Sequence, residues 1–342
     1  MTHLRKIVLG AATAGLFMSG AVSQSFAIEP GDFTNYLRGA TQGLPLGAAP
    51  PPGLYGSYSP NATGLGGGAG KGDAAIPGAA TAPAFGAGFA LLWVPGWKIF
   101  GGDYEFAVVQ GLYFATNEPN LNPPFAVSTN AMISPELANT DWTPIAVAWA
   151  LGHGFFVSAA VHIDAPIGSQ WGSTAADVNT NPDYWTVAPA FAVSYLDANW
   201  LLSANFRYDI AFASPGRTTA LPTFLPAAAN GYINGNELFG DFTALYKVGK
   251  WSFGPVGYFE AQTTQDRPGG GIACTPGICG FQSQIDVGGL VGYDFGPVAF
   301  QVWADYAVEC QNCVGANGWD VWGRVSFKIW GPDAAKPIVA KN

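Results

Sequence analysis

The sequence has little charge and few histidines. Charged residues make up 11% of its 342 residues, whereas they make up about a quarter of a typical soluble domain. A soluble protein of this length would need more charged side chains to cover its surface, so the composition argues against that class. Disorder is excluded as well, because 49% of the residues are hydrophobic and 12 are tryptophan, which is the opposite of a disordered composition. Only three histidines are present, one of them His3, so a histidine-rich metal site is excluded.

After residue 27 the sequence lacks any uninterrupted apolar run of the ~20 residues that a transmembrane helix needs. The first 27 residues are instead typical of a cleaved signal peptide. They comprise a basic stretch (MTHLRK), an apolar stretch (IVLGAATAGLFMSGAV), and small residues at Ser25 and Ala27, where cleavage requires them. We expect the mature chain to begin at Ile28 and to be exported.

Basic residues are scarce in this expected mature chain. Without Arg5 and Lys6 it has 12 basic and 23 acidic residues, a net charge of −11. That balance argues against nucleic acid as a partner. If the chain crosses a membrane, it must do so as a closed β-barrel, because no other arrangement of strands satisfies its backbone in lipid.

Alternation of apolar and polar residues, with a period of two, is what the sequence has in abundance. In LLSANFRYDIAF (201–212) the polar residues Ser203, Asn205 and Arg207 alternate with apolar ones. The segments FVSAAVHIDA (156–165) and WDVWGRVSFKIW (319–330) repeat this pattern. A period of two predicts β-strands. We expect about 12 strands, the others covering residues 53–60, 82–95, 103–116, 141–151, 184–197, 237–248, 250–262, 281–295 and 297–308.

The connections between these strands alternate in length. Short ones such as KVGK and DFGP alternate with long ones rich in Gly, Pro, Asn and Thr. Tight turns on one side and long loops on the other are typical of outer-membrane barrels, and tryptophans near strand ends are typical of membrane interfaces. We therefore predict an all-β transmembrane antiparallel β-barrel with short periplasmic turns and long extracellular loops. The long loops are expected at about 61–81, 117–140, 164–183, 213–235, 263–280 and 309–318.

The expected barrel begins after a run of three prolines. Pro50, Pro51 and Pro52 cannot donate backbone hydrogen bonds and favour extended polyproline geometry, so the first strand can begin only after them. We predict a signal peptide at 1–27, an N-terminal periplasmic lead-in or partial plug at 28–52, the barrel at 53–330 and a C-terminal periplasmic tail at 331–342.

One face of each strand carries the charged residues. If the apolar face meets lipid, this polar face lines the lumen, where its charges meet water or one another. Two interpretations are open. The charges brace the wall as ion pairs, for which Asp305 and Arg324 on adjacent strands are an example, or they tune a permeation path that their acidic excess makes mildly cation-selective. The lumen-lining candidates are Glu105, His162, Arg207, Asp209, Asp241, Lys247, Glu260, Asp286, Asp305, Arg324 and Lys328.

Four cysteines lie in the last two long loops, Cys274 and Cys279 in one and Cys310 and Cys313 in the other. In an exported chain an even number of cysteines indicates disulfides, here in one of three connectivities. A four-thiolate zinc site is the competing interpretation, although the oxidising compartment favours disulfides. Haem attachment is excluded because Val314, not His, follows Cys313.

No motif for catalysis is present. The sequence has no G-x-S-x-G nucleophile elbow, and one wall histidine, His162, among many serines does not identify a Ser–His pair. We expect no catalytic residues, no cofactor and no metal.

Five segments resemble a known family. They are APPPGLYGSY (49–58), LLWVPGWKIFGGDYEFAV (91–108), VSAAVHIDAPIGS (157–169), DYWTVAPAFAVSYLDANWLLSANFRYD (183–209) and VGYDFGPVAFQVW (291–303). Together they resemble the outer-membrane family named from meta-pathway phenol-degradation clusters, whose members include the SphA-like proteins.

The resemblance implies a barrel in the outer membrane of a Gram-negative bacterium that passes small hydrophobic or aromatic compounds inward. Its partners would be outer-membrane lipids and these solutes. The alternative is a surface-binding or structural barrel with a filled lumen, whose long loops contact a partner.

Overall fold

The computed structural model describes residues 35–65, 84–116, 133–168, 184–213, 232–268, 281–311 and 318–332. The expected signal peptide lies outside the described residues, as do most of the expected long loops and the last ten residues of the expected tail. No helix among the described residues is long and apolar enough to span a membrane.

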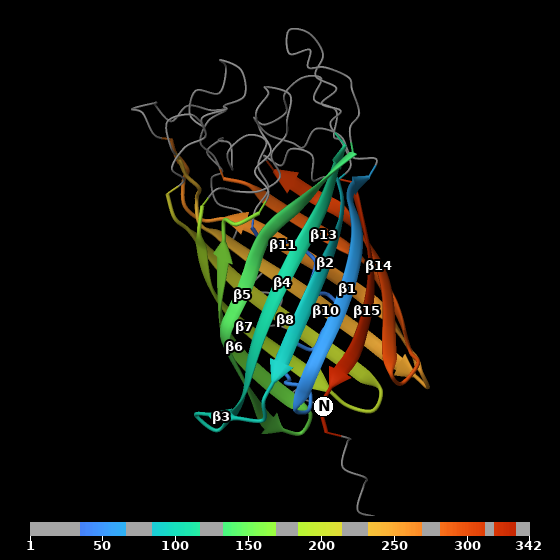
Figure 1. Ribbon diagram of the computed structural model, residues 1–342. Helices are drawn as coiled ribbons and strands as arrows, with labels where there is room; N and C mark the ends of the chain where they lie inside the picture. Colours follow the sequence, from blue (N-terminus) through green and yellow to red (C-terminus); the bar gives the residue numbers. More distant parts are fainter. Residues whose placement is uncertain are drawn as a thin grey trace, which may run out of the picture.

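Long antiparallel strands close into one barrel (Figure 1). Each strand pairs with the next one along the chain, and the first strand also pairs with the last, which closes the ring. This confirms the predicted fold class. The strands are β1 (Gly53–Leu65), β2 (Ala84–Val94), β4 (Gly102–Thr116), β5 (Ile133–Gly152), β6 (Phe155–Ala165), β7 (Thr186–Leu196), β8 (Trp200–Ala211), β10 (Glu237–Val248), β11 (Trp251–Gln262), β13 (Ser283–Asp294), β14 (Val298–Gln311) and β15 (Trp319–Trp330).

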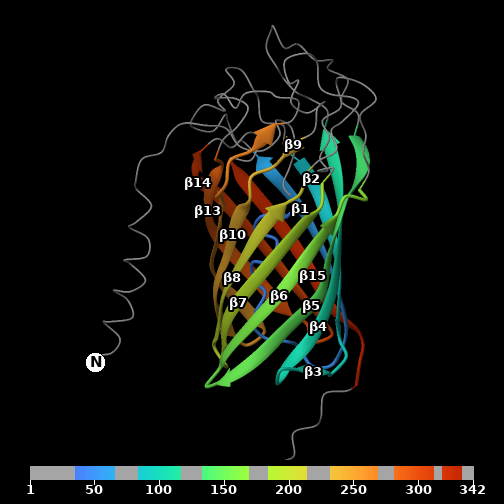
Figure 2. The ribbon, with the colours of Figure 1, turned by 90° about the vertical axis from the view of Figure 1, so that its left-hand side faces the viewer.

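The two ends of the barrel differ in their connections. At the end we call the turn end, neighbouring strands are joined by short turns, such as Gly249–Lys250 between β10 and β11. The connection between β2 and β4 is longer and contains β3 (Lys98–Ile99), which pairs back on β4. The opposite, long-loop end carries the longer connections and the small β9–β12 pair (Tyr232–Ile233 and Arg267–Pro268), seen above the wall in Figure 2.

Three strands extend further than the sequence indicated, all at the long-loop end, and one of them is β14, which continues to Gln311 rather than residue 308. β1 continues to Leu65 rather than residue 60, and β5 begins at Ile133 rather than residue 141. The segment at 133–140, which we expected to be loop, therefore pairs with β4. Beyond the lipid a strand needs no apolar face, so its sequence does not have to alternate, and the period-two signal fades before the backbone pairing does.

The outer face of the barrel is apolar and the inner face is polar. Along β13, Ile285, Val287 and Val291 are exposed, whereas the alternate residues Gln284 and Asp286 are buried. Aromatic residues gather on the outside of the turn end, where Trp251 packs on Tyr293 and Trp200 on Tyr246. A face so apolar is stable only against lipid, and the aromatic positions match a membrane interface.

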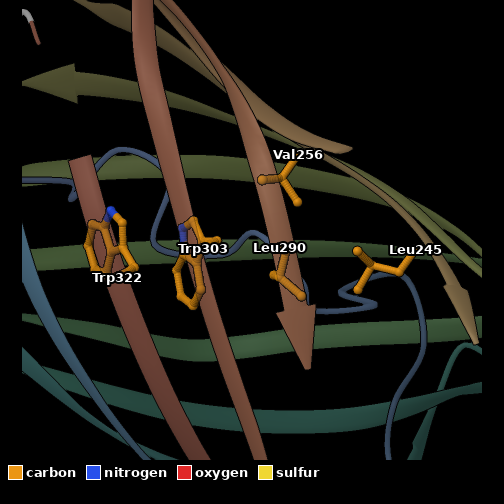
Figure 3. Packing of buried hydrophobic residues seen from close by; sticks show 5 residues of the cluster. All are labelled: Leu245, Val256, Leu290, Trp303 and Trp322. Carbon is orange, nitrogen blue, oxygen red and sulfur yellow. The ribbon is translucent and has the colours of Figure 1, made fainter. Parts of the chain in front are cut away.

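The hydrophobic core lies inside the barrel, on the inner face of β10–β15. It consists of Leu245, Val256, Leu290, Trp303 and Trp322 (Figure 3). Trp303 and Trp322 lie opposite each other on β14 and β15, and their rings are parallel within 1° at a centroid distance of 5.5 Å. The residues packed against this core include Leu37 and Ala40, which belong to the chain before β1. The core is thus shared between the wall and a segment inside the barrel.

Two neighbouring glycines of β13 test the assignment of inner and outer faces. At Gly288 a methyl group would lie 1.9 Å from the Ala304 carbonyl oxygen, whereas at Gly289 the nearest atom would be 4.0 Å away. Gly288→Ala should lower the free energy of unfolding by about 1–3 kcal/mol through overpacking, and Gly289→Ala should change it by less than about 0.5 kcal/mol. Urea titration of each folded variant in lipid vesicles measures both values. Equal effects would contradict the assignment.

Candidate functional site

Residues 35–52, which we call the lumen segment, run through the inside of the barrel. At the long-loop end Asn35 donates a hydrogen bond of 2.7 Å to Thr186 Oγ1, at the start of β7. At the turn end the segment leads into Gly53, the first residue of β1. Figure 2 shows this segment between the walls of the barrel. The described part of the expected lead-in therefore crosses the lumen from one end to the other.

Asp241 of β10 is the main acceptor for the lumen segment. Its carboxylate accepts hydrogen bonds from Tyr36 Oη at 2.6 Å, Gly39 N at 3.3 Å and Thr41 N at 3.2 Å, and a further one from Thr41 Oγ1. Asp241 is 3% exposed. A buried carboxylate is costly unless it is well hydrogen-bonded, so Asp241 and the lumen segment stabilise each other.

Arg324 of β15 holds the same segment through its carbonyl groups. It donates to Gln42 O at 2.7 Å and to Ala40 O, and also to Gln301 Oε1 at 3.1 Å. The ion pair that the sequence indicated between Arg324 and Asp305 is not formed. Asp305 lies opposite Asp320, and neither of its oxygens has a hydrogen-bond partner among the described residues. The guanidinium is directed to the lumen segment because carbonyl groups outside regular structure need donors.

A third charged contact comes from the lumen segment itself. Arg38 pairs with Glu260 of β11 at 2.5 Å and donates to Gln284 Oε1 of β13 at 3.1 Å. Glu260 is 1% exposed, so its charge depends on this partner. Arg38 lies outside any strand, and alternation therefore gave no signal for it.

Towards the turn end the segment is held by small hydroxyl side chains. Gly43 N donates to Thr243 Oγ1 at 2.8 Å, and Gly47 N donates to Ser194 Oγ at 2.9 Å. Ser158 Oγ donates to Leu46 O at 2.7 Å. The contacts thus change from charged groups at the long-loop end to neutral ones near the turns.

Arg207 of β8 gathers a cluster of carboxylates near the long-loop end. Its guanidinium lies 4.8 Å from the Tyr36 ring centroid, so the cluster also contacts the lumen segment. One guanidinium shared by three carboxylates leaves an excess of negative charge. The carboxylates are those of Asp209, at 2.6 Å, Asp141 and Asp164.

His162 lies beside this cluster. Its Nδ1 is 3.0 Å from Thr143 Oγ1 and 3.1 Å from Asp141 Oδ1. A catalytic relay needs the hydroxyl on one ring nitrogen and the carboxylate on the other, whereas here both contacts are made by the same nitrogen. The arrangement supports a role in the charge network rather than in catalysis.

The remaining lumen-lining candidates divide by burial. Glu105 is buried on β4, and Asp286 is buried on β13 beside Gln284, which donates to it at 2.8 Å. Lys247 and Lys328 are more exposed, and they donate to the carbonyl oxygens of Asp197 and Pro332 at the turn end.

The turn next to Lys247 has its own hydrogen-bond network. The Asp197 side chain accepts the backbone N–H groups of Asn199 and Trp200, and these bonds lower the pKa of its carboxyl group. Lys247 is thus part of a turn at the rim of the barrel, away from the buried acidic groups.

Several site residues were absent from the sequence-based candidates. Asp164 and Asp320 stand in the same alternating sets as His162 and Arg324, so their positions carried a signal that could have identified them. Asp141, Glu237 and Arg38 carried no such clear signal. Asp141 and Glu237 are the first residues of the expected strands 141–151 and 237–248, and Arg38 lies outside the strands.

Of the four cysteines, only Cys310 lies among the described residues. It is at the long-loop end of β14 and is disulfide-bonded. Cys274, Cys279 and Cys313 lie outside the described residues, and the three connectivities remain open.

The lumen segment packs unevenly against the wall. On β10–β15 the inward residues Asp241, Leu245 and Trp303 are at most 3% exposed. On β2 and β4, by contrast, the inward residues Ala90 and Val109 are half-buried, and a methyl group at Gly88 would have no atom closer than 3.9 Å. Around Gly88, Ala90 and Val109 the inner face of the wall is therefore more accessible than on β10–β15, and small residues line it there.

Comparisons with known proteins agree with this architecture. Residues 66–324 match the model of the family described as "Putative MetA-pathway of phenol degradation". No curated protein matches the sequence. An outer membrane channel from Pseudomonas putida F1 is 10% identical and has a TM-score of 0.58, over 82% of this chain and 96% of that one.

Two toluene transporters are more distant in structure. TbuX from Ralstonia pickettii is 10% identical, with a TM-score of 0.39 over 90% of this chain and 96% of its own. TodX from Pseudomonas putida is 9% identical, with a TM-score of 0.39 over 89% of this chain and 99% of its own.

Removing the Asp241 carboxylate should loosen the lumen segment. A hydrogen bond to a charged group contributes about 1.5–3 kcal/mol, so Asp241→Ala should speed amide exchange in residues 36–43 by at least about tenfold. Hydrogen–deuterium exchange followed by mass spectrometry measures this rate. Asp197→Ala, in an exposed turn, is the matched control and should leave it unchanged. Unchanged exchange in Asp241→Ala would mean that packing alone holds the segment.

Proposed function

The chain belongs to the MetA-pathway phenol-degradation family and folds as an outer-membrane barrel, and on that premise we propose that it is a passive channel for small hydrophobic or aromatic compounds. The lumen segment is its plug. The observation that carries the proposal is the accessible inner face around Gly88, Ala90 and Val109, which a solute could follow past the plug.

The lining of that face fits an uncharged aromatic solute. Ser59, Gly88, Ala90, Ala107 and Val109 lie on the inner face of three adjacent strands, as their strand register requires. They are small, and none is charged, so a flat apolar solute can lie against them. Two charged residues border this surface, Arg324, which donates to Ser59 Oγ at 3.4 Å, and the buried Glu105. An aromatic carboxylate would instead meet the acidic excess around Arg207 and pass less well.

The plug sets how wide this path is. Its hydrogen bonds to Asp241, Arg324 and Glu260 hold it against the opposite wall. These contacts can break one at a time, because Asp241, Arg324 and Glu260 lie on three different strands and bind different residues of the segment. The resting channel is therefore narrow, and displacement of the plug widens it.

The orientation follows that of outer-membrane barrels in general, with short turns on the periplasmic side and longer loops outside. Residues 1–27 act as the export signal, and the residues after Trp330 are periplasmic. No catalytic step belongs to this function.

A second candidate is a binding barrel whose loops contact a partner. The observation in its favour is that the lumen is filled on the β10–β15 side, because a barrel that only anchors binding loops in the membrane does not need an open path for a solute. The two candidates differ in whether uncharged solutes cross the protein, which the following experiment measures.

Replacing Ala90 by tryptophan should block the path. Ala90 faces the lumen, whereas the next residue, Leu91, faces outward and is 51% exposed. We expect Ala90→Trp to reduce phenol uptake into proteoliposomes by roughly tenfold or more, because an indole replaces the open space that the solute occupies. Leu91→Trp adds the same side chain to the lipid face and should transport like the wild type.

Three results would decide between the candidates. Uptake by the wild type with loss in Ala90→Trp alone supports the channel and its path. Uptake that both variants retain would place the path elsewhere in the lumen. No uptake by the correctly folded wild type, or by the plug-loosened Asp241→Ala, would reject the channel in favour of the binding barrel.

A further inference from the structure

The connection between β2 and β4 is a small hairpin on the outside of the turn end. Lys98 pairs with Asp103 and Ile99 with Gly102, so Phe100 and Gly101 form a two-residue loop. Their φ angles are 50° and 80°. Two positive φ values define the type I′ turn, in which Asn-Gly is the favoured pair.

Phe100 is therefore a costly residue at this position. A bulky side chain at positive φ is strained, and asparagine adopts the same conformation more easily. The strain is not repaid by packing within the chain, because Phe100 is 92% exposed. A residue that is both strained and unburied points to a contact outside the chain.

The hairpin continues the aromatic outer face of the barrel. Trp97, 58% exposed, contacts Trp93 of β2 at a ring-centroid distance of 5.4 Å and stacks on Tyr104 of β4 at 5.8 Å. Trp149 of β5 donates to Phe100 O at 3.0 Å and ties the loop to the wall. Figure 1 shows the hairpin projecting sideways from the barrel rather than along its axis. Its apolar side chains are thus held next to the lipid-facing wall.

We infer that this hairpin, residues 96–101, is a lipid anchor that inserts Phe100 and Trp97 into the headgroup–acyl boundary of the leaflet at the turn end. Aromatic side chains favour this depth because their apolar bodies meet acyl chains while their polar edges stay near water. Lys98, paired with Asp103 at 2.6 Å, lies on the same hairpin and is exposed. Its ammonium group can reach lipid phosphates while its stem lies along the apolar boundary.

The hairpin is continuous with the lipid-facing wall, and this favours lipid rather than a soluble protein as its partner. A docking site for a periplasmic protein would project along the barrel axis into water, whereas this loop extends from outward positions on β2 and β4 and is fixed to β5. The occupant is therefore the bilayer that surrounds those strands.

A second hairpin in the same barrel provides a matched control. His153 and Gly154 join β5 to β6 in a two-residue loop with φ angles of 51° and 83°. His153 is exposed, as Phe100 is. The substitutions Phe100→Asn and His153→Asn both create the favoured Asn-Gly pair, so in water both should stabilise the barrel by relieving strain.

The experiment is urea unfolding of the full chain in phosphatidylcholine vesicles. His153→Asn should raise the urea midpoint. Phe100→Asn should lower it, with the folded-to-unfolded ratio falling by about fivefold, because the lost lipid contact outweighs the relieved strain. Phe100→Leu keeps an apolar tip and should stay near the wild-type midpoint.

A second measurement does not depend on stability. The fluorescence difference between the wild type and Trp97→Phe isolates the signal of Trp97. Brominated phosphatidylcholine should quench this signal and acrylamide should not. A raised midpoint for Phe100→Asn, or quenching of Trp97 by acrylamide alone, would place the hairpin in water and overturn the anchor in favour of a soluble partner.

Discussion

Polar groups inside the barrel wall and lumen have to find their partners away from bulk water, and this constraint applies first to the backbone. A strand in lipid must be paired along both edges. The pairing of β1 with both β2 and β15 meets that requirement, because it leaves no open edge in the ring. In the closed ring, the side chains on one face of each strand contact lipid, and those on the other face point into a lumen of limited volume.

The same constraint applies a second time inside the lumen. The inner faces of β8, β10, β11 and β15 carry Arg207, Asp241, Glu260 and Arg324, each of them at most 3% exposed. Groups so buried need hydrogen bonds and counter-charges from the protein itself. The lumen segment supplies them to Asp241, Glu260 and Arg324 through Tyr36, Arg38 and the backbone of residues 39–42. Arg207 has its counter-charges on the wall and contacts the segment through the Tyr36 ring. The wall charges thus form the binding site of the lumen segment.

Alternation made the barrel predictable, because lipid on one side and a lumen on the other impose opposite polarity on successive residues. The alternation assigned each residue of β8 and β15 to a face, and it predicted correctly that Arg207 and Asp305 point inward. It could not predict which groups these charges bind. Arg324 was expected to pair with Asp305 on the next strand, but it donates to carbonyl groups of the lumen segment. That segment is not a strand, so its sequence does not alternate and its place inside the barrel could not be predicted. The early start of β5 was not predicted for a related reason, because a strand beyond the lipid does not need alternating polarity.

The entry of the lumen segment into β1 links the filling of the barrel to its assembly. The ring's final seam joins the first strand to the last, so it can close only after β15 has been synthesised. The chain immediately before β1 is the lumen segment, whose last residue, Pro52, directly precedes the strand that forms the seam. The strand that completes the ring therefore carries the lumen segment with it. Closure of this seam would therefore deliver, in a single step, a ring whose lumen is already partly filled.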